Sequence, residues 1–269
     1  MLAIFVSGSQ FYTSFALGSW LCLDFFDYKL NKTSILSYFY SHKHRHAFYI
    51  FFFTSFVFCF VIDYLWGVRI FKMWQWKNYG IIEFARMYFV MNASFVLGMY
   101  ELYRVLKTLL KRRFKERNIL HFRISTEKKK AFYLFMLFLG TVFFIFPIFM
   151  IYFNNYSFKE YIMLFLFMSM ILVSDAITFL TGGKPILGNV FRLDLLKIAS
   201  FALTVSIAVV FTEGLNLFGR EWVYLQMPFY NLQIFTVPVA VAIGWIPLVI
   251  GAISIINMIK HLDYAYKLR

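Results

Sequence analysis

Long apolar blocks separated by shorter polar segments dominate the pattern of the chain. Seven blocks are long enough to cross a bilayer, because about 20 apolar residues in a helix span the roughly 30 Å of hydrocarbon. They cover residues 4–26, 47–67, 81–103, 131–153, 159–180, 195–215 and 231–258. The pattern predicts an all-α fold, a polytopic transmembrane bundle of about seven helices that forms a single domain over residues 1–269.

Charge in the connecting segments predicts the orientation of the bundle, because cytoplasmic loops carry an excess of Lys and Arg. The segment 104–130 carries 11 Lys and Arg, whereas the segment 154–158 carries none. We therefore expect the first of these segments and the C-terminus in the cytoplasm and, with seven spans, the N-terminus outside. The segment 68–80 runs against the rule, since it lies outside in this orientation and still holds three cations.

Composition supports the membrane class and limits the partners. The chain is 61% hydrophobic and 15% charged, while soluble domains carry about 25% charged residues. The bias of cations toward the cytoplasmic side accounts for the net charge of +14 without nucleic acid. We expect an integral protein of a prokaryotic cytoplasmic membrane, with membrane lipids and other membrane proteins as partners. The stretch 104–117 alternates cations with Leu and Phe, which predicts a helix lying on the anionic inner leaflet.

Matching intervals divide the chain into two similar halves. Asp63 lies 18 residues before the third block, and Glu213 lies 18 residues before the seventh block. Each interval holds an aromatic-x-aromatic element, WQW in the first and WVY in the second. Since one helix joins the halves, a duplication would orient both in the same direction across the membrane, as a parallel repeat; chance spacing is the alternative. The predicted halves are 1–103 and 159–258, with the basic cytoplasmic segment 104–130 and a linker helix at 131–153 between them.

Two acids near the ends of spans are the first candidates for chemistry. A charged side chain at the centre of a bilayer costs about 2.5–3.5 kcal/mol on insertion scales, and less near the interface. One interpretation places Asp63 and Glu213 at the outer interface, where water hydrates both. The other turns both into a cavity between the halves, where burial suits them to donate or accept a proton. The direction in which the side chains point decides between these interpretations.

The residues that follow Glu213 form the most informative stretch. EGLNLFGREWVYLQMPF, followed by IFTVPVAVAIGWIPLVIG, gives an acid, a glycine, an aromatic-x-aromatic element and a Trp-x-Pro element in that order. This order resembles that of the integral-membrane carotenoid hydratases and the related small membrane lycopene cyclases. The first half, DYLWGVRIFKMWQW followed by GMYELY, resembles the cyclases as well. It departs from them at Glu101, which stands in Met-Tyr-Glu where the cyclases have Pro-Glu-Glu.

The resemblance implies acid–base chemistry on an isoprenoid chain. Protonation of a carbon–carbon double bond gives a carbocation, which aromatic faces stabilise through their quadrupoles. The catalytic acids would be Asp63, Glu101 and Glu213, and no cofactor is predicted. The substrate would lie against Trp76, Trp222, Tyr224, Trp245 and Asn216. The alternative for the aromatic residues is packing and interface anchoring, because a chain with 37 Phe, 18 Tyr and 6 Trp places a ring near almost any acid.

A glycine-rich segment at residues 181–194 is a candidate anion site. It carries Lys184 and Arg192, which can bind an anionic headgroup or a phosphate together with backbone N–H groups. The segment does not match the phosphate-binding P-loop motif. The alternative is an ordinary loop between two helices.

Histidines at alternate positions follow the first block. His42, His44 and His46 can bind a metal or a haem iron if the backbone there is extended. The simpler interpretation is a basic flank of the second span. Cys22 and Cys59 both lie in apolar blocks, which is typical of small buried hydrophobic residues. No metal site is therefore predicted.

Three functions remain open. The first is a membrane enzyme that acts on a lipid or isoprenoid, and the second is a non-catalytic accessory subunit of a larger membrane complex. The third is a small-molecule carrier, because seven spans arranged as three, one and three resemble the small SWEET-type sugar transporters. Those carriers have a proline in the first helix of each repeat, whereas the first proline of this chain is Pro147. A retinal protein is excluded, because the last block, 231–258, holds no lysine.

Overall fold

The computed structural model of the chain describes residues 11–41, 44–77, 79–114, 125–190 and 194–267. The long helices are α1 (Phe11–Asn31), α3 (Arg45–Cys59), α5 (Asn92–Arg113), α6 (Thr126–Tyr152), α7 (Ile162–Leu180), α9 (Leu195–Gly219) and α10 (Val239–Lys267). The shorter helical segments are α2 (Ile35–Tyr40), η3 (Phe60–Ile70), α4 (Ile81–Arg86), η4 (Met87–Met91), η5 (Lys159–Tyr161) and α8 (Leu187–Val190). The strands are β1 (Trp74–Trp76), β2 (Trp222–Tyr224), β3 (Gln233–Ile234) and β4 (Val237–Pro238).

Six helices of the described residues are long and apolar enough to cross a membrane, judged by length and composition. They run Arg45–Ile70, Ile81–Arg113, Thr126–Tyr152, Lys159–Leu180, Leu195–Gly219 and Val239–Ala265. The prediction of an all-α polytopic membrane bundle is therefore confirmed. The described part of block 4–26 belongs to α1, which is not among the six and carries Asp24, Asp27 and Lys29. The count of seven spans, the repeat and the orientation of the termini stay predictions.

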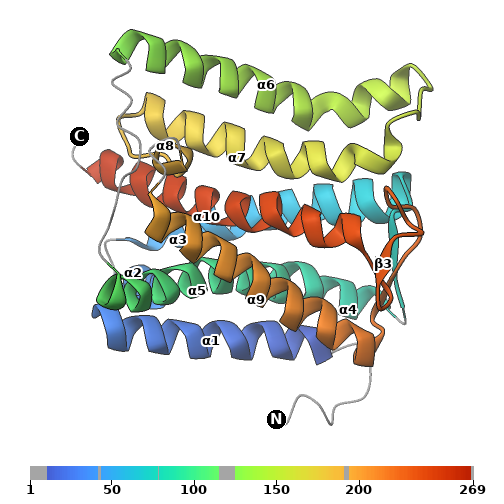
Figure 1. Cartoon of the computed structure of the whole chain (residues 1–269), viewed down its shortest axis with the longest axis horizontal. Coiled ribbons are helices and arrows are strands. Elements are labelled where there is room, and N and C mark those ends of the chain that lie inside the picture. Colours follow the sequence, from blue (N-terminus) through green and yellow to red (C-terminus); the bar gives the residue numbers. More distant parts are fainter. Residues whose placement is uncertain (1–10, 42–43, 78, 115–124, 191–193, 268–269) are drawn as a thin grey trace.

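The helices lie side by side in a bundle (Figure 1). α6 forms one edge and packs on α7, which packs in turn on α10. α1 forms the opposite edge and packs on α5, while α3, α5 and α9 lie between these layers. The largest buried cluster includes Phe51, Leu97, Leu166 and Ile256, from α3, α5, α7 and α10. These four helices therefore form the centre of the bundle.

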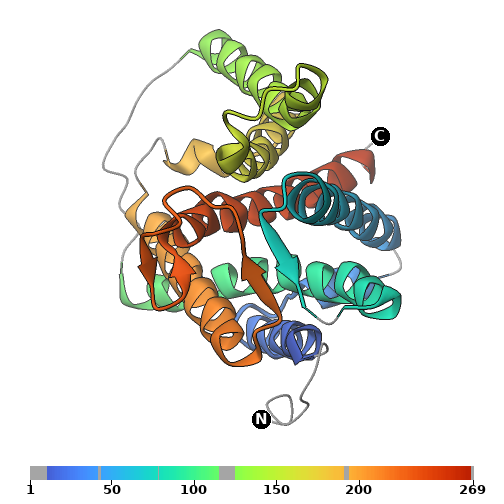
Figure 2. The same cartoon turned by 90° about the vertical axis from the view of Figure 1, so that its right-hand side faces the viewer.

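Two short strands close one end of the bundle (Figure 2). β1 pairs antiparallel with β2, so that Trp74 lies opposite Tyr224 and Trp76 lies opposite Trp222. The two aromatic-x-aromatic elements, far apart in the sequence, are thus direct neighbours. We call this pair of strands, residues 74–76 and 222–224, the lid.

Two segments near the lid are π-helical. The helix that begins as α3 widens into η3 over 11 residues, and the helix that begins as α4 widens over the five residues of η4. A π-helix closes its hydrogen bonds one residue later than an α-helix, and such segments occur frequently at functional sites. Asp63 lies in η3 and Tyr88 lies in η4, and the Tyr88 hydroxyl donates to Asp63 Oδ2 at 2.8 Å. The two irregular segments therefore meet at one carboxyl group.

A glycine sets the distance between α6 and α7. A Cβ atom on Gly140 would lie 2.9 Å from side-chain atoms of both Leu172 and Val173, and 3.1 Å from the backbone N of Val173. Small residues let membrane helices approach closely, and the packing gained in this way holds them together. Gly140 therefore permits the contact that joins α6 to the rest of the bundle.

We expect Gly140→Ala to lower the free energy of unfolding by about 1–3 kcal/mol, because the added methyl group overpacks this contact. Thermal unfolding of the purified protein in a mild detergent measures the effect. Gly18→Ala is the matched control, since a Cβ atom there meets nothing within 4 Å, and it should be neutral or stabilising by about 0.5–1 kcal/mol. Equal unfolding temperatures for the two variants would contradict the role of Gly140.

Candidate functional site

A cavity of about 340 Å³ lies beneath the lid. Residues of η3, α5, α7, α9 and α10 line it, together with residues of the lid itself. Its volume is at the lower end of the range typical of small-molecule sites, about 300–1,000 Å³. Most of the wall is apolar, and both Asp63 and Glu213 belong to it. The two acids therefore face one hollow from different helices.

Asp63 is held by one hydrogen bond on each carboxyl oxygen. The indole Nε1 of Trp74, in β1, donates to Oδ1 at 2.8 Å. The hydroxyl group of Tyr88, in η4, donates to Oδ2 at 2.8 Å. A carboxyl half-buried in an apolar wall is costly without such partners, so these two donors explain how Asp63 is tolerated there.

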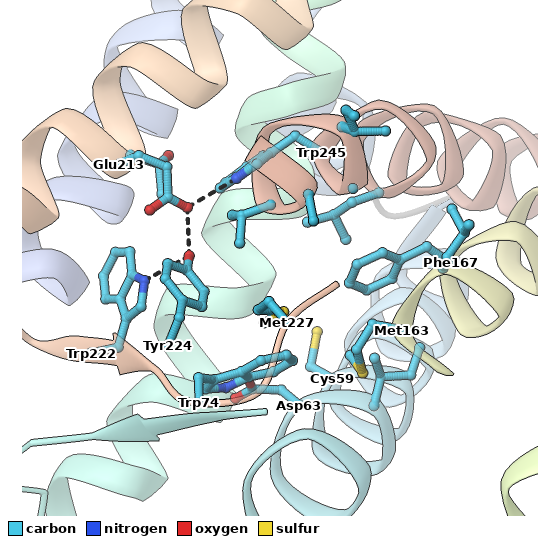
Figure 3. A pocket seen from close by; sticks show the side chains of 18 of the residues that line it. Cys59, Asp63, Trp74, Met163, Phe167, Glu213, Trp222, Tyr224, Met227 and Trp245 are labelled. Atoms are coloured by element: carbon cyan, nitrogen blue, oxygen red, sulfur yellow. Dashed lines mark hydrogen bonds between the residues drawn. The ribbon is translucent and has the colours of Figure 1, made fainter. Parts of the chain in front are cut away.

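Glu213 is held differently, with both of its donors on one oxygen (Figure 3). Its Oε1 accepts from the Tyr224 hydroxyl at 2.7 Å and from the Trp245 Nε1 at 3.0 Å. The Tyr224 hydroxyl accepts in turn from the Trp222 Nε1 at 2.9 Å. Within the described part of the chain, no donor reaches Glu213 Oε2, although the residue is only 4% exposed.

Tyr224 stays a neutral hydroxyl donor in this chain of hydrogen bonds. Burial raises the pKa of Tyr224 well above its ordinary value, and the neighbouring Glu213 carboxyl raises it further. The phenol therefore keeps its proton and orients the glutamate.

The aromatic residues predicted as the substrate wall all line the cavity, namely Trp76, Trp222, Tyr224 and Trp245. Asn216 has another place. Its amide Nδ2 donates to the Trp222 carbonyl at 3.1 Å, and its Oδ1 accepts from the Trp222 N–H at 3.2 Å. Asn216 thus fixes the start of β2 to the end of α9 and does not belong to the wall of the cavity.

Glu101 lies apart from Asp63 and Glu213. It is fully buried in α5, and its Oε1 accepts from the backbone N–H of Ile35 at 2.5 Å. Arg104, one turn further along α5, pairs with Asp27 at 3.1 Å. These contacts tie α1, α2 and α5 together, and Glu101 is not part of the cavity wall.

The other predicted ligand-binding residues lie away from the cavity. Lys184 is exposed in the turn after α7, and its carbonyl oxygen accepts from Asn257. His44 Nδ1 lies 2.5 Å from Asp263 Oδ2, and His46 is exposed. His42 and Arg192 fall outside the described residues, and so do residues 115–117 of the basic stretch. Among the described residues, no group of three His, Cys, Asp or Glu could hold a metal ion.

Three residues of the site were not predicted from the sequence. Trp74 and Tyr88 hold Asp63, and Glu221 lies at the edge of the lid. One signal could have identified Trp74: it follows Asp63 by 11 residues, just as Tyr224 follows Glu213 by 11. Tyr88 carried no such signal, because its contact depends on the π-helical turn of η4.

Glu221 connects the lid to α1. Its Oε1 accepts from the backbone N–H of Tyr12 at 2.8 Å, and its Oε2 accepts from the Tyr79 hydroxyl at 2.6 Å. Burial raises the pKa of Glu221 above its ordinary value, although the hydrogen bonds from Tyr79 and Tyr12 lower it in part. The folded lid therefore favours the protonated form of Glu221.

Comparison with protein-family models, with curated proteins and with solved structures gives no match for this chain. The resemblance to carotenoid hydratases and lycopene cyclases therefore stays a prediction from the sequence.

We expect Gly67→Ala to disturb the lid, because a Cβ atom there would overlap Cζ2 of the Trp74 ring. The ring must move, and Asp63 then loses a donor at a cost of about 1–3 kcal/mol. Near-ultraviolet circular dichroism of the tryptophans and thermal unfolding measure the change. Gly214→Ala is the control, since a Cβ atom there meets nothing within 4 Å; an equal effect of both substitutions would refute the contact.

The pH dependence of stability tests Glu221. Because its pKa is raised in the folded state, the folded state binds this proton more tightly than the unfolded chain does. The stability that this proton contributes is fully present below about pH 4.3, the pKa of a glutamate in the unfolded chain. It is lost as the pH rises through the higher pKa that Glu221 has in the folded state. Glu221→Gln should match the wild type at about pH 4 and unfold at a higher temperature than the wild type at about pH 8. A difference that does not vary with pH would contradict this.

Proposed function

We propose that the chain carries out acid–base processing of a neutral isoprenoid or lipid alkene within the bilayer. One observation supports this above all others: Asp63 and Glu213 line the same apolar cavity beneath an aromatic lid. A cavity with an apolar wall suits a hydrocarbon chain, and two carboxyl groups suit the transfer of protons to and from it.

The proposed reaction begins when a protonated carboxyl gives its proton to one carbon of a double bond. A C–H bond forms from the π electrons, the adjacent carbon becomes a carbocation, and the acid becomes a carboxylate. The cation is then resolved in one of two ways. Water adds and gives up a proton, which yields an alcohol, or a second double bond adds and the new cation loses a proton, which yields a ring. In both, the second carboxylate takes the proton, so that no oxidant or reductant is needed.

The hydrogen bonds suggest how the two acids divide this work. Both oxygens of Asp63 accept a hydrogen bond, whereas Glu213 keeps one oxygen that no described donor reaches. An oxygen that accepts no hydrogen bond leaves room for a proton that can be passed to a substrate. We therefore assign Glu213 as the initial acid and Asp63 as the initial base. Glu101 is left out of the reaction, because it lies outside the cavity.

We also propose that the two halves form the parallel repeat, with α1 as the first of seven spans. Matching contacts at matching intervals support it. Asp63 and Glu213 each accept from an aromatic residue 11 positions later. Asp24 and Asp175 each accept from a backbone N–H 12 positions later, that of Leu36 and that of Leu187. The cavity then lies between the halves, where transporters built from repeats also hold their ligands.

The proposed orientation places the lid outside and the basic end of α5 inside. α1 begins beside the lid, where Tyr12 bonds Glu221. Lys111, Arg112 and Arg113 form the last turn of α5, at the opposite end of the bundle. This arrangement agrees with the excess of cations expected on the cytoplasmic side of a prokaryotic membrane.

Deuterium uptake tests the reaction directly. The purified protein in lipid nanodiscs is given an acyclic carotenoid in heavy water, and the products are analysed by mass spectrometry. Protonation on carbon should add deuterium to the substrate. Glu213→Gln and Asp63→Asn should each slow this uptake by at least about 100-fold, the lower bound for general acid–base catalysis. Glu127→Gln, in the first turn of α6 away from the cavity, should leave it unchanged. Uptake that survives both cavity substitutions would end the proposal.

A further inference from the structure

The charge of the cavity wall has one sign. The described residues that line it include three acids, Asp63, Glu160 and Glu213, and no Lys, Arg or His. The absence of cations contrasts with a chain whose net charge is +14. Such a wall disfavours carboxylates and phosphates, because nothing there compensates a buried negative charge.

One of these acids is buried and incompletely paired. Glu213 is 4% exposed, and no described donor reaches its Oε2. A buried polar atom without a partner is costly. A group with positive charge would satisfy it beside the carboxylate form of Glu213, the form left after Glu213 gives up its proton.

Aromatic rings surround the same space. Four of the six tryptophans of the chain line the cavity, Trp74, Trp76, Trp222 and Trp245, and Tyr224 joins them. Figure 3 shows Trp74, Tyr224 and Trp245 around the hollow. A cation over the face of a tryptophan is attracted by the ring quadrupole, most strongly where the pair is desolvated. Quaternary ammonium groups are bound by such aromatic cages.

The rim of the cavity provides for a hydrocarbon chain. Leu164 of α7, Ile243 of α10 and Phe229 line the cavity and are 41%, 56% and 69% exposed. A ligand whose head lies among the acids can therefore extend its chain past these apolar side chains toward lipid.

We propose that this cavity binds lipophilic amines in their ammonium form, in preference to alcohols or carboxylates of the same chain length. The head group lies among Asp63, Glu213 and the indole rings, and the chain leaves over the rim. The inference rests on the proposed function, since the ammonium group takes the place of the transient carbocation.

Bromoalkyl probes test the preference, because bromine quenches tryptophan fluorescence on contact. The protein is reconstituted in nanodiscs of zwitterionic lipid, so that the bilayer itself carries no net charge. It is titrated with three probes that share one bromoundecyl chain and differ in the head: trimethylammonium, hydroxyl and carboxylate. We expect saturable quenching by the ammonium probe with an affinity at least about tenfold higher than for the other two. Equal affinities for the three heads in the wild type would overturn the inference without any variant.

Two variants locate the site. The double substitution of Asp63→Asn and Glu213→Gln should abolish the preference for the ammonium head, while Glu127→Gln should retain it. A preference that survives the double substitution would refute the proposed site. The experiment is independent of deuterium uptake. Ammonium binding without uptake would leave the binding site intact and end the proposed chemistry, whereas uptake without ammonium preference would end this inference alone.

Discussion

Burial of a carboxyl group beside hydrocarbon requires hydrogen-bond donors, and the lid end of the bundle is arranged around this requirement. A carboxyl group buried in an apolar wall has little contact with water, so side chains must supply the donors. Indole and phenol groups do so for Asp63 and Glu213. Of the four donors, Trp74 and Tyr224 belong to the paired strands and Tyr88 belongs to the π-helical segment η4. Because β1 lies against β2, one short structure serves two acids from distant parts of the chain.

The opposite end of the bundle meets the same requirement in another way. Asp24, Asp175 and Glu101 accept from backbone N–H groups in short segments that follow the helices. These backbone donors fix turns against the three carboxyl groups, and none of the three acids lines the cavity, which agrees with a structural role. Aromatic side-chain donors around a hollow leave such a space. The kind of donor, more than burial, therefore separates the acids that hold the fold from those that face the cavity.

The sequence predicted the class of fold and the two acids better than it predicted their surroundings. Hydrophobic blocks gave the helices because length and apolar composition act locally. The WQW and WVY elements follow Asp63 and Glu213 at matching distances along the chain. This spacing indicated that the two halves are similar, but it could not show that the two elements pair, because pairing depends on tertiary structure. The turns of η3 and η4 have no known signature in one sequence, and Tyr88 was missed for that reason. Glu101 was grouped with the other acids by resemblance alone, and its distance from the cavity follows from the packing of α1 and α2 on α5.

The distribution of charge connects the cavity to the orientation of the protein. The cations of the lid end, such as Arg69, lie outside the cavity wall, and Arg69 donates to Tyr64 instead. Two runs of three cations in described helices lie at the other end, one in the last turn of α5 and one near the start of α6. Since charges separated by more than about 10 Å of saline solution interact weakly, the acids keep a local negative potential despite the positive total. A neutral substrate that becomes positive during reaction would gain stabilisation from this potential, which a uniformly basic protein could not provide.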